Sequence, residues 1–368
     1  MQIQCTNCRQ PYPPQGVPHR CSNCGGIYDY TGAFLYDTVS LDPELPGIWR
    51  YRHTFGFPAD LVPLSLGEGD TPLVWAQVFG RQVAFKCEFL NPTGAFKDRG
   101  SAALVGFVRS RGVTMALEDS SGNAGASFAA YSARAGLQAR IFVPESTSGP
   151  KLAQIEITAA ELVTISGPRS NAAEAVLRVL SEPGNAAVYA SHAYLPFNLP
   201  GYATLAYELV AQLGCAPGSV LLPVGQGGLL LGISRGFQGL KNAGAISHLP
   251  QLVGVQARAC APLWALSAYG PSGLAWVAEA PTLAEGIRVR LPVRGDAVLQ
   301  AVAATGGGFL AVDEEEILPG LAALAKLGLY VEPTSAVVWG ALAQVIHRLP
   351  EPVVVVLTGS GFKYADIE

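Results

Sequence analysis

From about residue 82 to the C-terminus, short apolar segments alternate with segments of helical periodicity, and this alternation constrains the fold more than any other feature of the chain. Two apolar segments, SVLLPVG at 219–225 and PVVVVLTG at 352–359, have the length of a strand rather than of a core helix. Continuous apolar strands between helices are typical of a parallel sheet covered on both faces. We therefore expect an α/β fold with its ligands beyond the carboxyl ends of the strands.

The composition of the 368 residues limits the possible functions. Hydrophobic residues make up 49% and charged residues 14%, so the chain can bury a large core, and its length suggests two lobes. The net charge of −4 includes no basic excess, which argues against a nucleic-acid partner. No apolar run approaches the roughly 20 residues of a membrane helix, and the first residues lack the features of a secretion signal. We expect a soluble, cytoplasmic protein with no membrane partner.

Seven cysteines in a cytoplasmic chain suggest thiols or metal ligands rather than disulfides. Four of them form two pairs, each with two intervening residues: Cys5 and Cys8, then Cys21 and Cys24. Two such pairs supply four thiolates, which tetrahedral zinc prefers, and leave the metal no open position. We predict a structural zinc site, and the alternative is a set of free cysteines left from a lost site. The other three stand singly in apolar contexts and are expected in the core: Cys87, Cys215 and Cys260.

Four loops at predicted strand ends contain the residues of most chemical interest: 91–97, 120–125, 224–229 and 357–361. In VGQGGL (224–229), closely spaced glycines leave backbone N–H groups uncovered at a helix start, where the helix dipole also favours a phosphate. This loop is neither a Walker A loop nor a dinucleotide fingerprint, and a simple tight turn is the alternative. The loop SSGNAG suits a carboxylate. Its Asn123 is a candidate donor to a phenolate-type oxygen, or the helix N-cap.

Lys97, within NPTGAFKDRG (91–100), lies near the start of a predicted helix. A helix N-terminus disfavours a cation, and residues that break a local rule concentrate at functional sites. An apolar, electropositive place favours the free amine, which can form a Schiff base with an aldehyde. A cofactor with both an aldehyde and a phosphate would satisfy Lys97 and the glycine-rich loop together. We therefore predict pyridoxal 5'-phosphate.

Four motifs in this order resemble the threonine synthase family of fold-type II pyridoxal-phosphate enzymes, in the tryptophan synthase beta-like superfamily: NPTGAFKDRG, SSGNAGAS, PVGQGGL and LTGSGFK. LGEGDTPL (66–73) and EPTSAVV (332–338) are similar to further segments of that family, and the cysteine pairs are similar to the ribbon of many members. The resemblance implies a homodimer of two-lobed chains, with parallel-rich twisted sheets flanked by helices and an N-terminal zinc-ribbon-like module. The implied domains are the module at 1–35, a large cofactor-binding domain at 36–97 and 193–368, and a small mobile domain at 98–192.

The resemblance also implies residue roles. Lys97 would form the Schiff base with the cofactor and move protons on the substrate, Asn123 would donate to the ring oxygen, and Thr358 would face the pyridine nitrogen. The backbone of five residues would bind the cofactor phosphate: Gly225, Gln226, Gly227, Gly228 and Leu229. Three residues would receive the substrate carboxylate: Ser120, Ser121 and Ala124. Because a hydroxyl cannot stabilise a pyridinium as a carboxylate would, the ring should be a milder electron sink, which suits elimination and replacement.

The sequence departs from the family at one position. Threonine synthase acts on O-phosphohomoserine and uses an arginine for its phosphate, and the matching residue here is Asn198, which cannot replace a bidentate clamp. PTLAEGIRV (281–289) is also similar to the dehydratase side of the superfamily. We interpret His192 as a partly buried histidine with a partner rather than as a substrate contact.

Three hypotheses about function therefore stay open. The first is a threonine synthase or close paralogue that converts O-phospho-L-homoserine and water to L-threonine and phosphate. The second is a β-elimination or replacement enzyme that is threonine/serine dehydratase-like or cysteate-synthase-like. The third is a non-catalytic zinc-ribbon scaffold, against which the presence of Lys97 argues.

Overall fold

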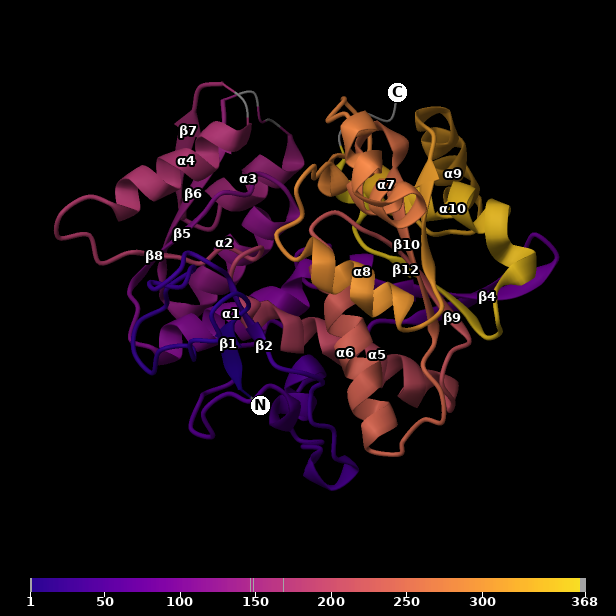
Figure 1. Cartoon of the computed structure of the whole chain (residues 1–368), viewed down its shortest axis with the longest axis horizontal. Coiled ribbons are helices and arrows are strands. Elements are labelled where there is room, and N and C mark those ends of the chain that lie inside the picture. The colour runs from indigo at the N-terminus through magenta and orange to yellow at the C-terminus, as the bar shows by residue number, and fades with distance from the viewer. Residues whose placement is uncertain (1, 146, 148, 168, 365–368) are drawn as a thin grey trace. The chain divides into compact units, whose positions relative to one another are not determined.

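The computed structural model describes residues 2–145, 147, 149–167 and 169–364, and the predicted α/β fold is confirmed (Figure 1). The chain divides into two compact units. The first comprises Met1–Gly69 and Lys97–Gly201, and the second comprises Asp70–Phe96 and Tyr202–Glu368. Residues 36–69 therefore group with the first unit. The domain boundaries expected from the sequence describe a small domain at 98–192 that moves separately from the large one. These boundaries remain a prediction.

The first unit contains a four-stranded parallel sheet. Its order is β7 (Glu161–Ile165), β6 (Gln138–Pro144), β5 (Met115–Glu118) and β8 (Val188–Tyr189). Its helices are α1 (Lys97–Ser110), α2 (Asn123–Ala135), α3 (Pro150–Glu156) and α4 (Arg169–Leu180). Helix α4 packs on one face of the sheet, where Val176 joins Leu117, Phe142 and Tyr189 in a buried cluster.

The N-terminal module belongs to the first unit. Strands β1 (Ile3–Cys5) and β2 (Tyr28–Tyr30) pair antiparallel. The ring of Tyr12 lies edge-on to Tyr28 at 4.7 Å and to Phe197 at 5.1 Å between centroids. Arg111 of α1 also donates to the carbonyl oxygen of Pro13 at 3.2 Å. Aromatic packing and this hydrogen bond therefore hold the module against the body of its unit.

The second unit contains a six-stranded sheet. Its order is β11 (Gly308–Val312), β10 (Gln251–Ala257), β9 (Ser219–Pro223), β12 (Val353–Leu357), β4 (Arg81–Cys87) and β3 (Leu73–Val78). Only β3, at the edge, runs antiparallel to its neighbour among the described strands of this sheet. The later helices are α5 (Leu199–Leu213), α6 (Gly228–Asn242), α7 (Pro262–Tyr269), α8 (Gly295–Ala303), α9 (Glu314–Lys326) and α10 (Pro333–Val345).

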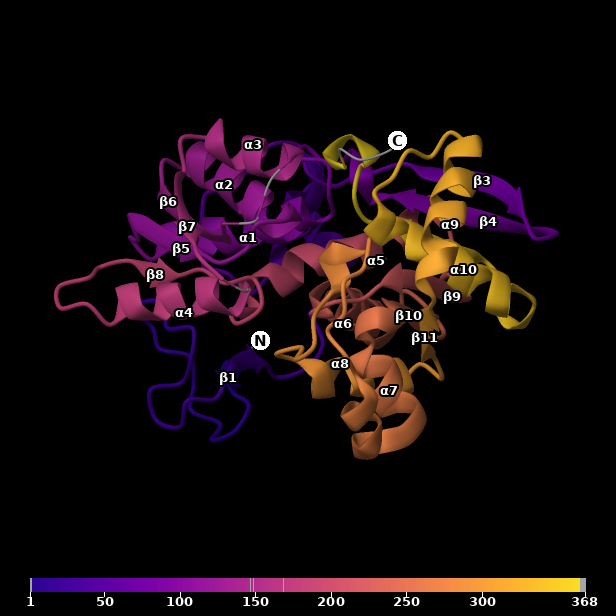
Figure 2. The ribbon, with the colours of Figure 1, turned by 90° about the horizontal axis from the view of Figure 1, so that it is seen from above.

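The two faces of this sheet pack against different helices because side chains alternate along each strand. On β4, Val83 and Phe85 join the buried cluster formed with α9 and α10. Lys86 points to the opposite face, where its partners are on α5. Figure 2 shows α9 and α10 beside the strands of this sheet. The predicted cap of α9 is confirmed, since Asp313 and Glu316 form a capping box.

Short 3₁₀ helices connect several of these elements: Thr38–Ser40, Gly47–Thr54, Glu88–Leu90, Pro196–Asn198, Arg258–Cys260, Gly270–Trp276, Glu285–Ile287, Ile346–Arg348 and Gly361–Lys363. No helix in the described part of the chain is both long and apolar enough to span a membrane.

Some expectations differ from the structure. The sequence pattern did not predict β3, β11, α7 or α8, which lie in stretches where glycine and proline interrupt the periodicity. The prediction that Cys215 is a core residue is wrong, because this side chain is exposed beyond the end of α5, whereas Cys87 and Cys260 are buried.

Candidate active site

Three of the four predicted loops lie at one edge of the sheet in the second unit. Strand β12 lies between β9 and β4, because Val353 is opposite both Ser219 of β9 and Val83 of β4. These three strands are parallel. Their carboxyl ends therefore lie at the same edge. The loops that follow are 224–227, 358–360 and 88–96, so the topology brings the glycine-rich loop, Thr358 and the segment before Lys97 to one place.

The glycine-rich loop has the features of an anion cradle. The first N–H groups of α6 have no acceptor within the helix, and no side chain caps Gly227, whose φ is +79°. A Cβ atom at position 227 would lie 2.5 Å from a methyl carbon of Val298, and one at 225 would lie 3.0 Å from the Cα atom of Ile287. Side chains are thus excluded from both positions, and the peptide N–H groups stay exposed to a ligand.

Gln226, between these glycines, is turned away from the cradle. Its Oε1 accepts a hydrogen bond from the backbone N–H of Val293 at 3.0 Å. The side chain therefore braces the loop, and only the backbone of Gln226 is available to a phosphate.

Thr358, directly after β12, is buried and belongs to a small hydroxyl network with Ser335 of α10. The two hydroxyl oxygens are 2.9 Å apart. The Ser335 oxygen also accepts the backbone N–H groups of Thr358 at 2.9 Å and of Gly359 at 2.8 Å. This serine holds the loop after β12 on the N-terminal turn of α10.

The segment before Lys97 is fastened to the same loop. The N–H of Phe96 donates to the carbonyl oxygen of Thr358 at 3.0 Å, and the N–H of Ser360 donates to that of Gly94 at 2.9 Å. Lys97 follows Phe96 directly and is the first residue of α1, which confirms the prediction that it lies near a helix start. The two hydrogen bonds therefore hold the segment up to Phe96 against the loop that follows β12.

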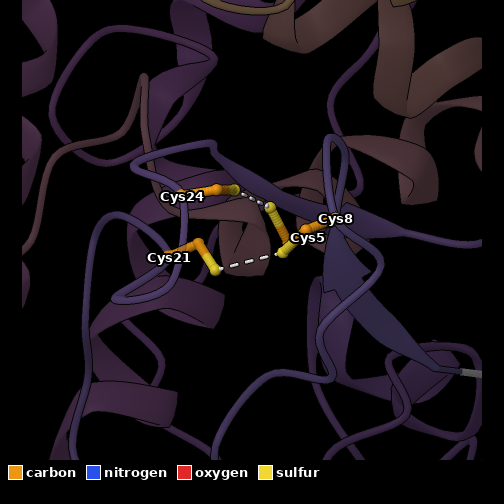
Figure 3. Close-up of side chains that lie close together, drawn as sticks. All are labelled: Cys5, Cys8, Cys21 and Cys24. Carbon is orange, nitrogen blue, oxygen red and sulfur yellow. Dashed lines mark hydrogen bonds between the residues drawn. The ribbon is translucent and has the colours of Figure 1, made fainter.

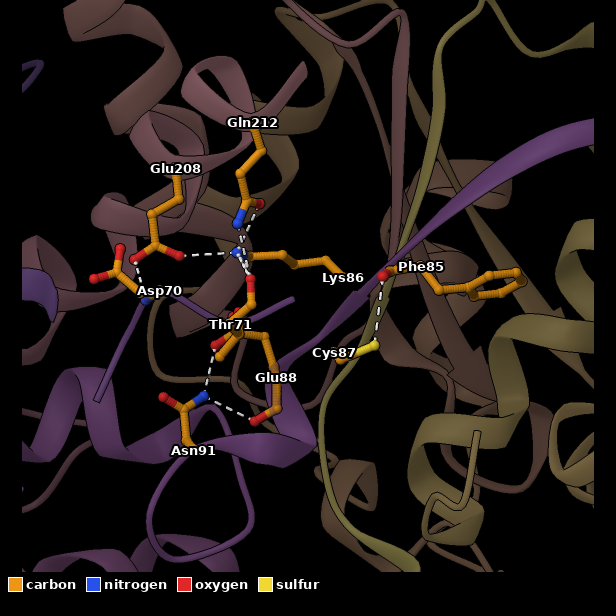
Figure 4. A network of polar contacts seen from close by, with 9 residues as sticks. All are labelled: Asp70, Thr71, Phe85, Lys86, Cys87, Glu88, Asn91, Glu208 and Gln212. Carbon is orange, nitrogen blue, oxygen red and sulfur yellow. Dashed lines mark hydrogen bonds and ion pairs between the residues drawn. The ribbon is translucent and has the colours of Figure 1, made fainter. Parts of the chain in front are cut away.

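A buried polar network lies beneath this segment (Figure 4). The ammonium group of Lys86 has three acceptors: the carbonyl oxygen of Thr71 at 2.7 Å, a carboxylate oxygen of Glu208 at 2.8 Å and Oε1 of Gln212 at 3.0 Å. Both charged side chains are buried, at 0% and 2% exposure. The network connects β4 to α5 and to the chain that enters β3.

Glu88 extends the network towards the lysine segment. It accepts hydrogen bonds from the hydroxyl of Thr71 at 2.6 Å and from the amide of Asn91 at 3.0 Å. Asn91 is the first residue of the motif NPTGAFKDRG. The network was not predicted from the sequence. Its signal there is a lysine and a glutamate next to apolar residues where β4 ends, in FKCE (85–88).

The fourth loop belongs to the first unit and connects β5 to α2. Gly122 is the N-cap of α2 and provides no side-chain cap, so the interpretation of Asn123 as the N-cap is wrong: it is the first helical residue. A Cβ atom at position 125 would lie 1.8 Å from the carbonyl oxygen of Ser120, so only glycine permits this close turn. Ser120 and Ala124 are buried, and Ser121 is half-buried. The loop thus presents hydroxyls at an uncapped helix N-terminus.

Glu68, in the predicted signature LGEGDTPL, is a buried acid of the first unit. Burial raises the pKa of this carboxyl, and the hydrogen bond from the hydroxyl of Tyr131 opposes that shift. The Tyr131 oxygen lies 2.6 Å from the Glu68 carboxylate. This bond anchors the signature segment to α2, the helix that follows the serine loop.

His192 has the partner that the sequence interpretation expected, since its Nδ1 lies 2.8 Å from the carboxylate of Glu118. Asn198 is buried, and its amide nitrogen donates to the carbonyl oxygen of His192 at 2.6 Å. Position 198 therefore presents a neutral amide that is held by the backbone.

The four cysteines of the N-terminal module converge (Figure 3). The sulfur atoms of Cys5 and Cys24 are 3.4 Å apart, those of Cys8 and Cys21 are 3.6 Å apart, and all four lie within 4.8 Å of one another. A tetrahedron of thiolates with bonds of about 2.3 Å to zinc requires sulfur separations of about 3.8 Å. The cluster therefore has the dimensions of a four-thiolate zinc site.

Comparisons with known proteins agree with this chemistry. Residues 64–359 match the family model described as pyridoxal-phosphate dependent enzyme. The chain is 30% identical to threonine synthase of Methanosarcina acetivorans, over 97% of this chain and 91% of that protein. It is 32% identical to threonine synthase of Methanocaldococcus jannaschii, over 99% and 93%.

Solved structures share the fold. A threonine deaminase from T.th. is similar with a TM-score of 0.65 and 27% identity, covering 81% of this chain and 94% of that one. Maize serine racemase is similar with a TM-score of 0.67, covering 81% of this chain and 89% of that one. At 20% identity, the second likeness concerns the fold alone.

The buried Lys86–Glu208 pair generates a stability prediction. The variant Glu208→Gln leaves the Lys86 ammonium buried without its counter-charge, and we expect the free energy of unfolding to fall by about 3–5 kcal/mol in a urea titration. The matched control is Glu351→Gln, because the Glu351 side chain is 62% exposed and its carboxylate lies 2.5 Å from Arg81. That change should cost no more than about 1 kcal/mol. Equal losses in the two variants would contradict the assignment of the internal network.

Proposed function

Because this chain belongs to the threonine synthase family of pyridoxal-phosphate-dependent enzymes, we propose that it converts O-phospho-L-homoserine and water to L-threonine and phosphate. The observation that best supports the proposal is the similarity to threonine synthases over nearly the whole of both chains. The loops at one edge of the second sheet supply the groups that such a reaction needs.

The residues present fit pyridoxal phosphate. The backbone N–H groups of Gly225, Gln226, Gly227, Gly228 and Leu229 would bind the phosphate, in a cradle that a Cβ atom at 225 or 227 would obstruct. Thr358 would meet the pyridine nitrogen with a hydroxyl. When bound, the cofactor withdraws electrons from the α carbon of the amino-acid substrate, and a hydroxyl partner keeps that withdrawal moderate.

Lys97 is the residue that we propose to join the cofactor aldehyde. Lys86 is a poor alternative, because its ammonium group is paired with Glu208 and has three acceptors. Lys97 instead lies in the first turn of α1, where the helix dipole favours the neutral amine. The same amine would move protons between the substrate carbons during elimination of phosphate and addition of water. Asn123 would donate its amide to the ring oxygen of the cofactor.

The loop before α2 is the proposed site of the substrate carboxylate. Ser120, Ser121 and Ala124 lie at a helix start whose N-cap, Gly122, has no side chain to cap it, and backbone N–H groups and the helix dipole would stabilise a carboxylate there. Gly125 permits the turn. The donors in this loop would orient the substrate relative to Lys97.

Asn198 favours a second candidate function, a β-elimination or replacement reaction on serine, threonine or phosphoserine. Its amide is held by the carbonyl oxygen of His192 and has no positive charge to offer a distal phosphate. A dehydratase-like enzyme that acts on serine or threonine would not need a second phosphate clamp, because neither substrate carries a phosphate.

A parallel substrate assay separates the two candidates. With O-phosphohomoserine, O-phosphoserine, serine and threonine offered separately, we expect phosphate and L-threonine in equal amounts from the first only. Phosphate release and chromatography of the amino acids provide the measurement. A 2-oxo acid from serine or threonine, without turnover of O-phosphohomoserine, would replace the first proposal by the second.

Loss of the cofactor chromophore tests the role of Lys97. The purified protein should be yellow, and Lys97→Ala should abolish the visible absorbance that depends on the covalent bond to the aldehyde. Lys326→Ala, at an exposed position in the last turn of α9, is the matched control and should keep the wild-type spectrum. A wild-type protein that stays colourless after addition of the cofactor would favour the scaffold hypothesis.

For the N-terminal module we propose a structural zinc ion held by Cys5, Cys8, Cys21 and Cys24. Four protein thiolates leave no position for water or substrate, so the ion would stabilise the module rather than take part in the reaction. Tyr12 and Arg111, which hold the module to its unit, would keep their contacts only while the module is folded.

Elemental analysis tests the zinc proposal. We expect one zinc per chain in the wild-type protein and loss of the metal in Cys8→Ser, because three thiolates bind zinc less tightly than four. The control is Cys215→Ser, which changes an exposed cysteine outside the cluster and should retain one zinc per chain. Full retention of zinc in Cys8→Ser would contradict the site.

On the family resemblance we also propose a homodimer in the cytoplasm. Sedimentation of the purified chain tests the first part of this proposal, and imaging of the tagged chain in cells tests the second.

A further inference from the structure

A single hydroxyl group joins the two helices that carry Lys97 and Asn123. Ser127, on α2, donates to a carboxylate oxygen of Asp98 at 2.6 Å, and its oxygen lies 2.7 Å from the hydroxyl oxygen of Ser101. Asp98 and Ser101 are both on α1. Ser127 and Asp98 are completely buried and Ser101 is 8% exposed. Water therefore has little access to these hydrogen bonds.

The contact between the two helices lies one turn from both proposed cofactor contacts. Residues four apart lie on the same face of an α-helix. Ser101 follows Lys97 at this spacing on α1, and Ser127 follows Asn123 at the same spacing on α2. The bonds of Ser127 thus connect the two helix starts close to the residues that would meet the cofactor.

A second hydrogen bond on the same face of α2 restricts the rotation of this helix. Tyr131 is again four residues beyond Ser127, and its hydroxyl donates to the Glu68 carboxylate at 2.6 Å. Burial and, next, the nearby carboxylate of Asp98 raise the pKa of Tyr131, so this hydroxyl keeps its proton and remains a donor. Buried bonds at two successive turns therefore fix how α2 is rotated about its axis, and with it the direction of Asn123.

The cofactor itself requires a fixed spacing of its contacts. Pyridoxal phosphate carries its aldehyde and its ring oxygen on neighbouring carbon atoms. An amine that reaches the aldehyde and an amide that donates to the oxygen must therefore keep one separation, because a hydrogen bond weakens steeply when its geometry changes.

We propose that Ser127 is a positioning residue that sets the spacing of Lys97 and Asn123 for these two neighbouring groups. The inference rests on the proposed function, in which Lys97 joins the aldehyde and Asn123 donates to the ring oxygen. It adds the residue through which the placement of one contact depends on the placement of the other.

A serine suits position 127 because its side chain is short. Two serine hydroxyls can meet only where the helix backbones approach closely, and α1 and α2 pack against each other. In Ser127→Ala, α2 loses its bonds to Asp98 and Ser101, while Tyr131 still holds the helix to Glu68. We therefore expect a folded protein in which Asn123 is less well placed.

The absorbance spectrum of the holoenzyme tests the proposal. The cofactor bound through Lys97 absorbs in the visible when its ring oxygen is a phenolate, and in the near ultraviolet when that oxygen is a neutral phenol. A hydrogen-bond donor to the oxygen favours the phenolate. The ratio of the visible to the near-ultraviolet band should therefore fall about fivefold in Asn123→Ala and in Ser127→Ala, the factor expected for the net value of one hydrogen bond.

The matched control is Ser132→Ala. Ser132 is on the same helix and is equally buried, and its hydroxyl has no hydrogen-bond partner among the residues that the structure describes. This variant should keep the wild-type ratio of the two bands. An equal decrease in Ser132→Ala would overturn the specific role of Ser127, because any buried hydroxyl of α2 would then have the same effect.

A double variant tests whether Ser127 acts through Asn123. In an Asn123→Ala background, the further change Ser127→Ala should lower the ratio no further, whereas an independent effect would multiply the two decreases. A further decrease of the same size, or a wild-type ratio in Asn123→Ala alone, would overturn the positioning role.

Ser101→Ala keeps the bond from Ser127 to Asp98 and serves as a second, milder test. Its ratio should lie between those of the wild type and Ser127→Ala. If Ser127→Ala does not fold, a wild-type ratio in Ser101→Ala overturns the proposal, and a lowered ratio supports it.

The outcomes also separate this inference from the proposed function. If the wild-type protein binds no cofactor, or if Lys97→Ala keeps the chromophore, the proposed function fails. If the chromophore forms through Lys97 and both Ser127→Ala and Ser101→Ala keep the wild-type ratio of the two bands, the proposed function stands and only the role of Ser127 is lost.

Discussion

The parallel pairing of β12 with both β9 and β4 is the constraint on which the candidate site depends. Residues 353–357 of β12 are completely buried, because apolar side chains cover both faces of the strand. A slip of its register by one residue would exchange those faces and would move Thr358 away from Ser335. Burial of these five consecutive apolar side chains thus positions the polar loop that follows β12.

Polar contacts below the loops complement this apolar scaffold. Lys86 and Glu208 are desolvated, and their pairing with Thr71 and Gln212 is the condition under which two charges can stay in the core. Glu88 and Asn91 continue the network into the segment that precedes Lys97. Each hydrogen bond forms only in a particular direction. The network therefore restricts the arrangement of the chain more than apolar packing alone would.

The sequence alone predicted the α/β alternation, a helix start near Lys97 and the capping of α9 by Asp313, because each depends on local pattern. It did not predict the partners of Lys86 on α5, of which Glu208 lies 122 residues further along the chain. It also assigned no role to Ser335, although EPTSAVV was noticed, because the N–H groups and the hydroxyl that this serine binds come from another part of the chain, 23–24 residues further on. Local patterns are enough to predict helices and strands. Contacts between residues that are far apart in the sequence become evident only in the folded structure.

Substrate choice is a separate problem from cofactor chemistry in this fold. The proposed contacts to the cofactor phosphate and ring nitrogen belong to strand ends of the second unit, and the serine loop and Asn198 belong to the first. A threonine deaminase and a serine racemase share the fold over 81% of this chain. A common scaffold therefore supports different reactions, and the differences must come from individual side chains. We propose that Asn198 is a residue of that kind: it is a buried neutral amide where the family resemblance implies an arginine, so it would alter the charge offered to a distal phosphate without altering the backbone that would bind the cofactor.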